Sequence, residues 1–166
     1  MTHPTIDQLE MLSLFHREKI PDGYLDLMGH MNIQFYVKLF DAAAWELLRQ
    51  LGMTEAYARE QQNGMFALRQ VIDYVAEVHV GETVAVRSRV NGRSAKRLHF
   101  THFMINETTG KLAATMEVLS SHADLTIRRT SPFPPELATH IDALLAEQQQ
   151  LPWQPHFSGA IHPQTV

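Results

Sequence analysis

The periodicity of apolar residues changes sharply near residue 64, and this change most constrains the fold. Before it, apolar side chains recur every three or four residues, the pattern of a helix buried on one face. These residues are Ile33, Tyr36, Val37, Phe40, Ala44, Leu47, Leu48 and Leu51. Asn32 is a favourable N-cap, and Gly52 is a favourable C-terminal stop. The sequence therefore predicts one long helix from about residue 33 to 51.

After residue 64, stretches of the chain alternate between apolar and polar residues, as strands do. The predicted strands are 13–20, which precedes the helix, and 66–79, 83–90, 98–106 and 111–123, which follow it. Asn91-Gly92 and Glu107–Gly110 are predicted turns. Consecutive strands joined by tight turns imply an antiparallel meander. The predicted class is α+β, with the long helix packed on one face of the sheet.

The segments that flank these elements complete the predicted organisation. Residues 1–12 are expected to form an arm or a short helix, and residues 54–64 a second short helix. We predict a single domain over residues 1–130, followed by a C-terminal helix and proline-rich tail over 131–166. The helix in that last segment is predicted at 136–150. The tail carries Trp153 and Phe157 and is apolar enough to dock on a partner subunit.

Composition narrows the function classes. The formal net charge of −4 gives no electrostatic case for nucleic acid as a partner. The absence of cysteine excludes disulfides, thiolate catalysis and cysteine-ligated zinc. The N-terminus lacks the features of a signal peptide, and no apolar run approaches the roughly 20 residues that cross a bilayer. A cytoplasmic protein without a membrane partner is expected.

The segment from Tyr24 to Tyr36 carries the clearest chemical signal. It places Asp26, Gly29, His30 and Asn32 directly before the long helix. A carboxylate in a tight loop can attack a carbonyl or activate water, while a helix N-terminus offers N–H groups to a developing oxyanion. The alternative is that Asp26 is a structural turn residue at the helix entrance.

This segment resembles the Asp-x-x-Gly-His-x-Asn-x-x-x-Tyr stretch of hotdog-fold acyl-CoA thioesterases of the 4-hydroxybenzoyl-CoA thioesterase type. The resemblance extends over roughly residues 12–125. It implies an antiparallel sheet wrapped around one long central helix, and active sites between the subunits of a homodimer or a dimer of dimers. It also implies that Asp26 is the catalytic nucleophile or general base, and that Gly29, His30 and Asn32 form the helix entrance. Many relatives carry asparagine where this chain has Ile33.

The expected substrate is an acyl-CoA. Basic residues gather around the predicted Asn91-Gly92 turn, where arginine and lysine could hold the phosphates of coenzyme A. The predicted substrate-binding residues are Tyr36, Gly64, Arg87, Arg89, Lys96 and Arg97. The alternative is a solvated hairpin whose charges protect an edge. A second set of residues could line an apolar acyl pocket or belong to the core: Phe40, Trp45, Met53 and Phe66.

Other chemistries find little support. His99 and His102 lie three apart in a predicted strand and so point to opposite faces, which does not suit a shared metal ion. We expect no metal site and no cofactor. A Gly-x-Ser-x-Gly elbow and a Walker-type loop are both absent from the sequence. The remaining carboxylates and backbone dipoles suit a thioester, whose thiolate leaves without a strong acid.

Three functions of different kinds remain open at this point. The first is an acyl-CoA thioesterase. The second is an acyl-CoA hydratase or dehydratase of the same fold, although those enzymes normally space their Asp and His five residues apart with a proline between. The third is a non-enzymatic acyl-CoA-binding protein, which would not need Asp26. Hydrolysis assays on a panel of acyl-CoAs separate the first function from the third.

Overall fold

An antiparallel sheet forms the framework of the computed structural model, which describes residues 3–154 and 157–161. Its strands are β1 (Leu14–Lys19), β2 (Asn63–Tyr74), β3 (Thr83–Arg93), β4 (Arg97–Asn106), β5 (Lys111–Asp124) and β6 (Arg129–Thr130). Its helices are α1 (Ile6–Glu10), α2 (Ile33–Gln50), α3 (Glu55–Glu60) and α4 (Pro135–Gln149), with a short 3-10 turn η1 (Asp22–Tyr24). The described part of the chain contains no helix that is both long and apolar enough to span a membrane.

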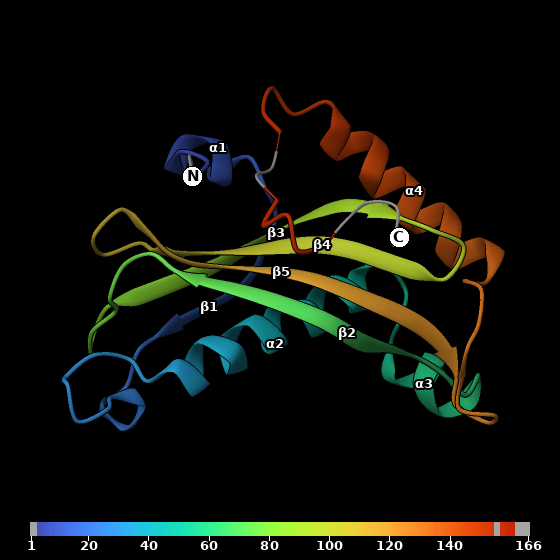
Figure 1. Cartoon of the computed structure of the whole chain (residues 1–166), viewed down its shortest axis with the longest axis horizontal. Coiled ribbons are helices and arrows are strands. Elements are labelled where there is room, and N and C mark those ends of the chain that lie inside the picture. The colour runs from blue at the N-terminus through green and yellow to red at the C-terminus, as the bar shows by residue number, and fades with distance from the viewer. Residues whose placement is uncertain (1–2, 155–156, 162–166) are drawn as a thin grey trace. The chain divides into compact units, whose positions relative to one another are not determined.

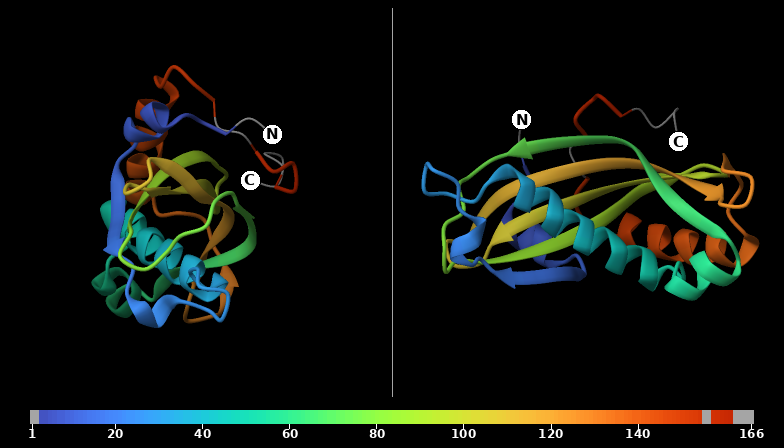
Figure 2. Two further views of the ribbon diagram at one scale, coloured as in Figure 1. Left: turned by 90° about the vertical axis from the view of Figure 1, so that its left-hand side faces the viewer. Right: turned by 90° about the horizontal axis from the view of Figure 1, so that it is seen from below.

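The strands follow the order β1-β3-β4-β5-β2, with β6 paired to β5 (Figure 1). In the right-hand view of Figure 2 they succeed one another from β2 at the top to β1 at the bottom. Two bonds fix the direction of β2 against β5. Val75 N–H donates to the Ala113 carbonyl at 2.8 Å, and Leu125 N–H donates to the Gln62 carbonyl at 2.7 Å. The predicted α+β class and the antiparallel sheet are confirmed. The predicted meander holds for β3, β4 and β5, whereas β2 pairs with β5 instead of with β3, the next strand along the chain.

The chain divides into two compact units. The first comprises Met1–Glu46, Ile72–Ser88 and His102–Met116, and the second comprises Leu47–Val71, Arg89–Thr101 and Glu117–Val166. In the first unit the helix packs on β4, where the rings of Phe40 and His102 stack at a centroid distance of 5.9 Å. Full burial lowers the pKa of His102 to about 3, so this imidazole is a neutral part of the core.

The buried face of α2 differs from the predicted stripe. Its buried residues include Tyr36, Leu39, Phe40, Ala43 and Leu47, whereas Ile33 is 64% exposed and Val37 is 38% exposed. Because the two exposed residues are apolar as well, α2 is apolar over more than one face. Periodicity alone therefore could not show which face is buried. The predicted extent of the helix is correct to within one residue at its end.

In the second unit, α4 and the chain that follows it pack on the sheet. Gln148 Oε1 accepts a bond from Val90 N–H at 2.7 Å, and Asp142 Oδ1 accepts one from Arg93 Nε at 2.6 Å. Trp153 and Ile161 are buried. The tail, predicted to dock on a partner subunit, thus packs in part against its own chain.

Several predicted boundaries were wrong, among them that of the strand predicted at 66–79, which is observed at Asn63–Tyr74. Asn91 and Gly92 lie within β3, and the turn follows at Ser94, whose N–H donates to the Arg97 carbonyl at 2.9 Å. The Asn91 side chain donates to Thr101 Oγ1 at 2.9 Å, which favours a strand over a turn there. The second short helix ends at Glu60 instead of near residue 64, because β2 begins at Asn63.

Candidate functional site

The segment between η1 and α2 is a tight loop closed on itself. An antiparallel bridge joins Leu25 and Met31. Within it, Asp26 N–H donates to the His30 carbonyl at 3.0 Å, and Gly29 N–H donates to the Asp26 carbonyl at 3.2 Å. Gly29 has φ +87°, a left-handed conformation that glycine adopts without a Cβ penalty. The motif therefore forms the compact helix entrance that the sequence predicts.

Side chains on both sides anchor this loop. The buried Tyr24 precedes it, and the Tyr24 ring stacks on the Phe35 ring at 3.9 Å. The Tyr24 hydroxyl donates to Glu18 Oε1 of β1 at 2.7 Å and accepts a bond from Lys38 Nζ of α2. At the other end, Met31 N–H donates to the Val78 carbonyl at 2.7 Å. The loop is thus fixed to a strand, to the helix and to the segment after β2.

The Asp26 carboxylate is oriented by the loop. Its Oδ1 accepts a bond from Met28 N–H at 2.8 Å, while Oδ2 lies 3.5 Å from His30 Nδ1. Its side chain is 15% exposed, so the carboxylate remains accessible to a small reactant. Asn32 caps the helix as predicted, since Asn32 Oδ1 accepts from Gln34 N–H at 3.1 Å. A carboxylate and a histidine therefore meet in the loop that leads into the capped helix.

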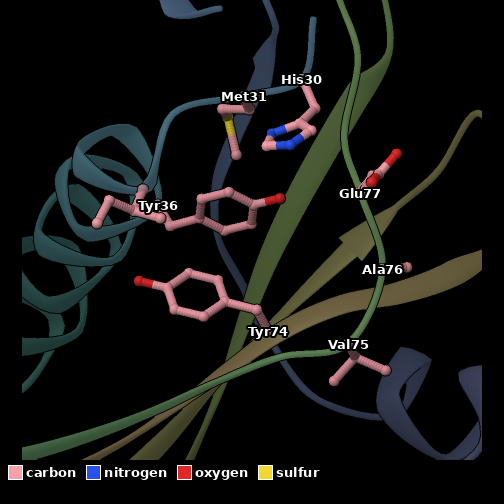
Figure 3. Close-up of a pocket in the computed structure, with 8 residues that line it drawn as sticks. His30, Met31, Tyr36, Tyr74, Val75, Ala76 and Glu77 are labelled. Atoms are coloured by element: carbon pink, nitrogen blue, oxygen red, sulfur yellow. The ribbon is translucent and has the colours of Figure 1, made fainter. Parts of the chain in front are cut away.

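A pocket of about 240 Å³ opens beside this loop (Figure 3). It is lined by His30, Met31, Ile33, Tyr36, Tyr74, Val75, Ala76 and Glu77. The rings of Tyr36 from α2 and Tyr74 from β2 meet edge to face at 5.1 Å, with planes 87° apart. His30 belongs both to this lining and to the contact with Asp26. Asp26 therefore neighbours a partly aromatic cavity that can receive a reactant.

The predicted substrate-binding residues fall into both units. In the first unit Tyr36 lines the pocket, and Arg87 donates to the Leu12 carbonyl. In the second unit Gly64 lies under Leu125, whose Cδ2 is 3.4 Å from where a Cβ on residue 64 would stand. Lys96 is exposed in the turn after β3, and Arg97 is half-buried.

Arg89 has a different environment from the other predicted phosphate ligands. It is only 3% exposed. Its Nη1 donates to the Trp153 carbonyl at 2.8 Å, and its Nη2 donates to the Gln148 carbonyl at 3.1 Å. Its guanidinium also lies 4.5 Å from the Trp153 ring centroid. These contacts tie Arg89 to the C-terminal segment.

Several polar residues of the pocket and of the second unit were not predicted from the sequence. Tyr74 and Glu77 join the pocket from 38 and 41 residues beyond Tyr36, and no local pattern marks them. In the second unit, His99 Nε2 lies 2.7 Å from Glu117 Oε1, and Glu117 Oε2 accepts from Ser158 N–H at 2.8 Å. Burial lowers the pKa of His99, with the Glu117 hydrogen bond opposing this shift. Alternation predicted these strands but could not identify side-chain partners across them.

Known proteins resemble this chain in sequence and in fold. A betainyl-CoA thioesterase of Pseudomonas aeruginosa is 27% identical over 143 residues, which cover 86% of this chain and 89% of that protein. An L-carnitine dehydrogenase/betainyl-CoA thioesterase of Agrobacterium fabrum is 31% identical over 134 residues, which cover 81% of this chain and 27% of that longer protein. A Staphylococcus aureus protein, solved in complex with CoA, superimposes with a TM-score of 0.79 at 24% identity over 86% of this chain and 90% of that one.

The family model of the thioesterase-like superfamily matches residues 20–141, a range that includes the Asp26 loop, α2 and strands β2 to β5. The fold inferred from the sequence resemblance, an antiparallel sheet with one long helix, is the hotdog fold of these thioesterases. Since the match spans well over half of its length, the chain belongs to the thioesterase-like superfamily and is a thioester hydrolase.

Proposed function

We propose that the chain hydrolyses an acyl-CoA thioester, with Asp26 as the catalytic carboxylate. The observation that carries this proposal is the Asp26 carboxylate itself. Met28 N–H holds it through Oδ1, and it stands at the entrance of α2, within 3.5 Å of His30. A carboxylate held in this way keeps one oxygen directed by the loop and a second oxygen available for proton transfer or attack.

Two routes lead from this arrangement to products. As a general base, Asp26 takes a proton from water, the hydroxide adds to the carbonyl carbon, and the C–S bond breaks to release the CoA thiolate. As a nucleophile, Asp26 forms a mixed anhydride with release of the thiolate, and water then hydrolyses the anhydride. In both routes, the positive end of the α2 dipole stabilises the negative charge on the carbonyl oxygen.

A panel of acyl-CoAs tests the proposal directly, with free thiol release as the readout. Thiol release that saturates with substrate and is equal in amount to the acid formed supports hydrolysis. Tight binding of acyl-CoA without thiol release would support the non-enzymatic binding protein instead. Formation of an α,β-unsaturated or hydroxylated acyl-CoA would favour the hydratase or dehydratase alternative.

The identity of the acyl group is a more specific part of the proposal. Two relatives are named for betainyl-CoA. The betainyl group carries a permanent positive charge on a trimethylated nitrogen, two bonds from the thioester carbonyl carbon. We therefore place betainyl-CoA first in the panel, followed by neutral acyl-CoAs of similar size.

Lys96 and Arg97 are proposed to hold phosphates of coenzyme A. The double variant Lys96→Gln/Arg97→Gln is expected to raise KM severalfold with little change in kcat, because remote phosphate contacts are alike in the ground and transition states. Lys111→Gln, an exposed lysine at the start of β5, is the matched control. Initial-rate kinetics at constant ionic strength measure both effects. An unchanged KM in the double variant would instead favour the alternative interpretation, in which these residues are solvated charges of a hairpin.

We propose a homodimer formed through β2. This strand ends the sheet order, and five consecutive residues on it, 66–70, are exposed on both of its faces. Phe66 is 45% exposed and Leu68 is 50% exposed. An apolar edge of this kind favours pairing with a second copy.

Size-exclusion chromatography with light scattering is expected to report a dimer at micromolar concentration. Leu68→Lys should shift the protein towards monomer, because a charge in the centre of an apolar edge opposes pairing. Met11→Lys, at an apolar residue that is 52% exposed at the end of α1, should leave the mass unchanged. A wild-type protein that remains monomeric over this range contradicts the dimer.

A further inference from the structure

We propose that Tyr36, Tyr74 and Glu77 form a subsite for a positively charged, alkylated nitrogen on the acyl group. This inference rests on the proposed thioesterase function and adds the residues that choose the substrate. It begins from the pocket beside the Asp26 loop, whose lining includes all three residues.

The two tyrosines provide perpendicular aromatic walls. Their planes are 87° apart and their centroids 5.1 Å apart, so the rings meet as two sides of a corner (Figure 3). The electron-rich faces of aromatic rings attract ammonium groups, and quaternary ammonium ligands are commonly bound between such rings. A neutral branched alkyl group would gain only apolar contact from the same walls.

The charges around the pocket favour a cation. Among its eight lining residues there is no lysine or arginine, and Glu77 is the one carboxylate. Glu77 stands at the rim, with its carboxylate directed away from the two rings in Figure 3, so it acts through space. The pKa of Tyr36 is raised to about 12, first by burial and then by Tyr74, Glu77 and Glu82.

The position of the pocket suits a short acyl group. His30 lines the pocket and contacts Asp26, and Ile33 at the start of α2 lines it as well. Because His30 contacts both Asp26 and the pocket, an acyl group whose thioester lies beside Asp26 has the pocket next to it. The volume of about 240 Å³ well exceeds the roughly 30 Å³ share of one water molecule, so a compact branched group fits.

The test compares two substrates of the same shape. One is betainyl-CoA, and the other is 3,3-dimethylbutyryl-CoA, in which a carbon atom replaces the charged nitrogen. The ammonium group also activates the thioester chemically, so the raw ratio of kcat/KM values does not measure recognition. The change in that ratio from wild type to variant does measure recognition, because the difference in intrinsic reactivity between the two substrates is the same for both proteins and cancels.

Tyr74→Leu removes an aromatic face and keeps apolar volume, and it is expected to lower the ratio of charged to neutral substrate by about 3- to 30-fold. Tyr74→Phe retains the face and should keep the ratio within about twofold. Glu77→Gln, at an exposed site, should lower the ratio by about 2- to 5-fold. Glu10→Gln, an exposed glutamate of α1, is the charge control.

The outcomes separate this inference from the function on which it rests. Hydrolysis of both substrates with a ratio that neither Tyr74→Leu nor Glu77→Gln changes would overturn the subsite and leave the thioesterase intact. Hydrolysis of other acyl-CoAs, with betainyl-CoA left uncleaved, would do the same. No hydrolysis of any acyl-CoA would remove both proposals together. Thermal melting of each variant confirms that a changed ratio comes from folded protein.

Discussion

Asp26→Asn is expected to lower kcat for thioester hydrolysis by about 10²–10⁴-fold, the usual contribution of a positioned general base. The amide keeps the size of the carboxylate, and Asn Oδ1 can still accept the bond that Met28 N–H donates to Asp26. What it loses is the negative charge and the proton-accepting oxygen next to His30. Turnover with the best acyl-CoA of the panel, together with thermal melting, measures the effect.

Asp22→Asn is the matched control for this variant. Asp22 belongs to η1 just before the loop and is exposed, so its amide should retain wild-type turnover. Near-normal turnover in a well-folded Asp26→Asn protein would contradict the carboxylate mechanism. In that case His30 would be the next candidate for the base, because its Nδ1 lies 3.5 Å from the same carboxylate and its side chain lines the pocket.

Arg89→Ala is expected to reduce the free energy of unfolding by about 2–5 kcal/mol. The substitution leaves two carbonyls, those of Gln148 and Trp153, without the donor that Arg89 supplies. It also removes the cation from the face of the Trp153 ring. Because Arg89 is 3% exposed, water does not readily replace these contacts. Urea denaturation measures the loss as a lower midpoint at unchanged slope.

Arg69→Ala provides the comparison for that experiment. Arg69 also bonds the C-terminal segment, through Nη1 to the Ala160 carbonyl at 2.6 Å, but it is exposed. Water can solvate both groups after truncation, so a loss below about 1 kcal/mol is expected. Equal losses in the two variants would show that burial does not distinguish these arginines.

Local signals in the sequence sufficed for most of the framework. Alternation predicted the strands, the 3.6-residue period predicted α2, and Asn32 marked where the helix starts. The prediction of a turn at Asn91-Gly92 was wrong because the preference of this dipeptide for turns is local. In the folded chain, a hydrogen bond across the sheet from the Asn91 side chain to Thr101 favours a strand instead. The prediction of which face of α2 is buried was wrong in part, because the exposed Ile33 and Val37 are as apolar as the residues that are buried.

The candidate site was predictable only in part, for a reason of distance along the chain. Asp26, Gly29, His30 and Asn32 lie within seven consecutive residues, so their spacing reveals a loop at a helix entrance. Tyr74 and Glu77 reach the same pocket through the pairing of β2 with β5, which depends on the whole sheet. A single sequence contains no local pattern for such an encounter. The role of the pocket could therefore be argued only from the folded chain.

The bond between Glu117 and Ser158 has a consequence for work with shortened proteins. A chain cut after Gln150 would keep every helix and strand found in the described residues, and by secondary structure alone it would look complete. It would nevertheless lose the amide that Ser158 donates to the buried Glu117 carboxylate, and the carbonyl of Trp153 that accepts from Arg89. Trimming irregular termini is a routine aid to crystallisation. In this protein it would strip partners from two buried ionisable side chains.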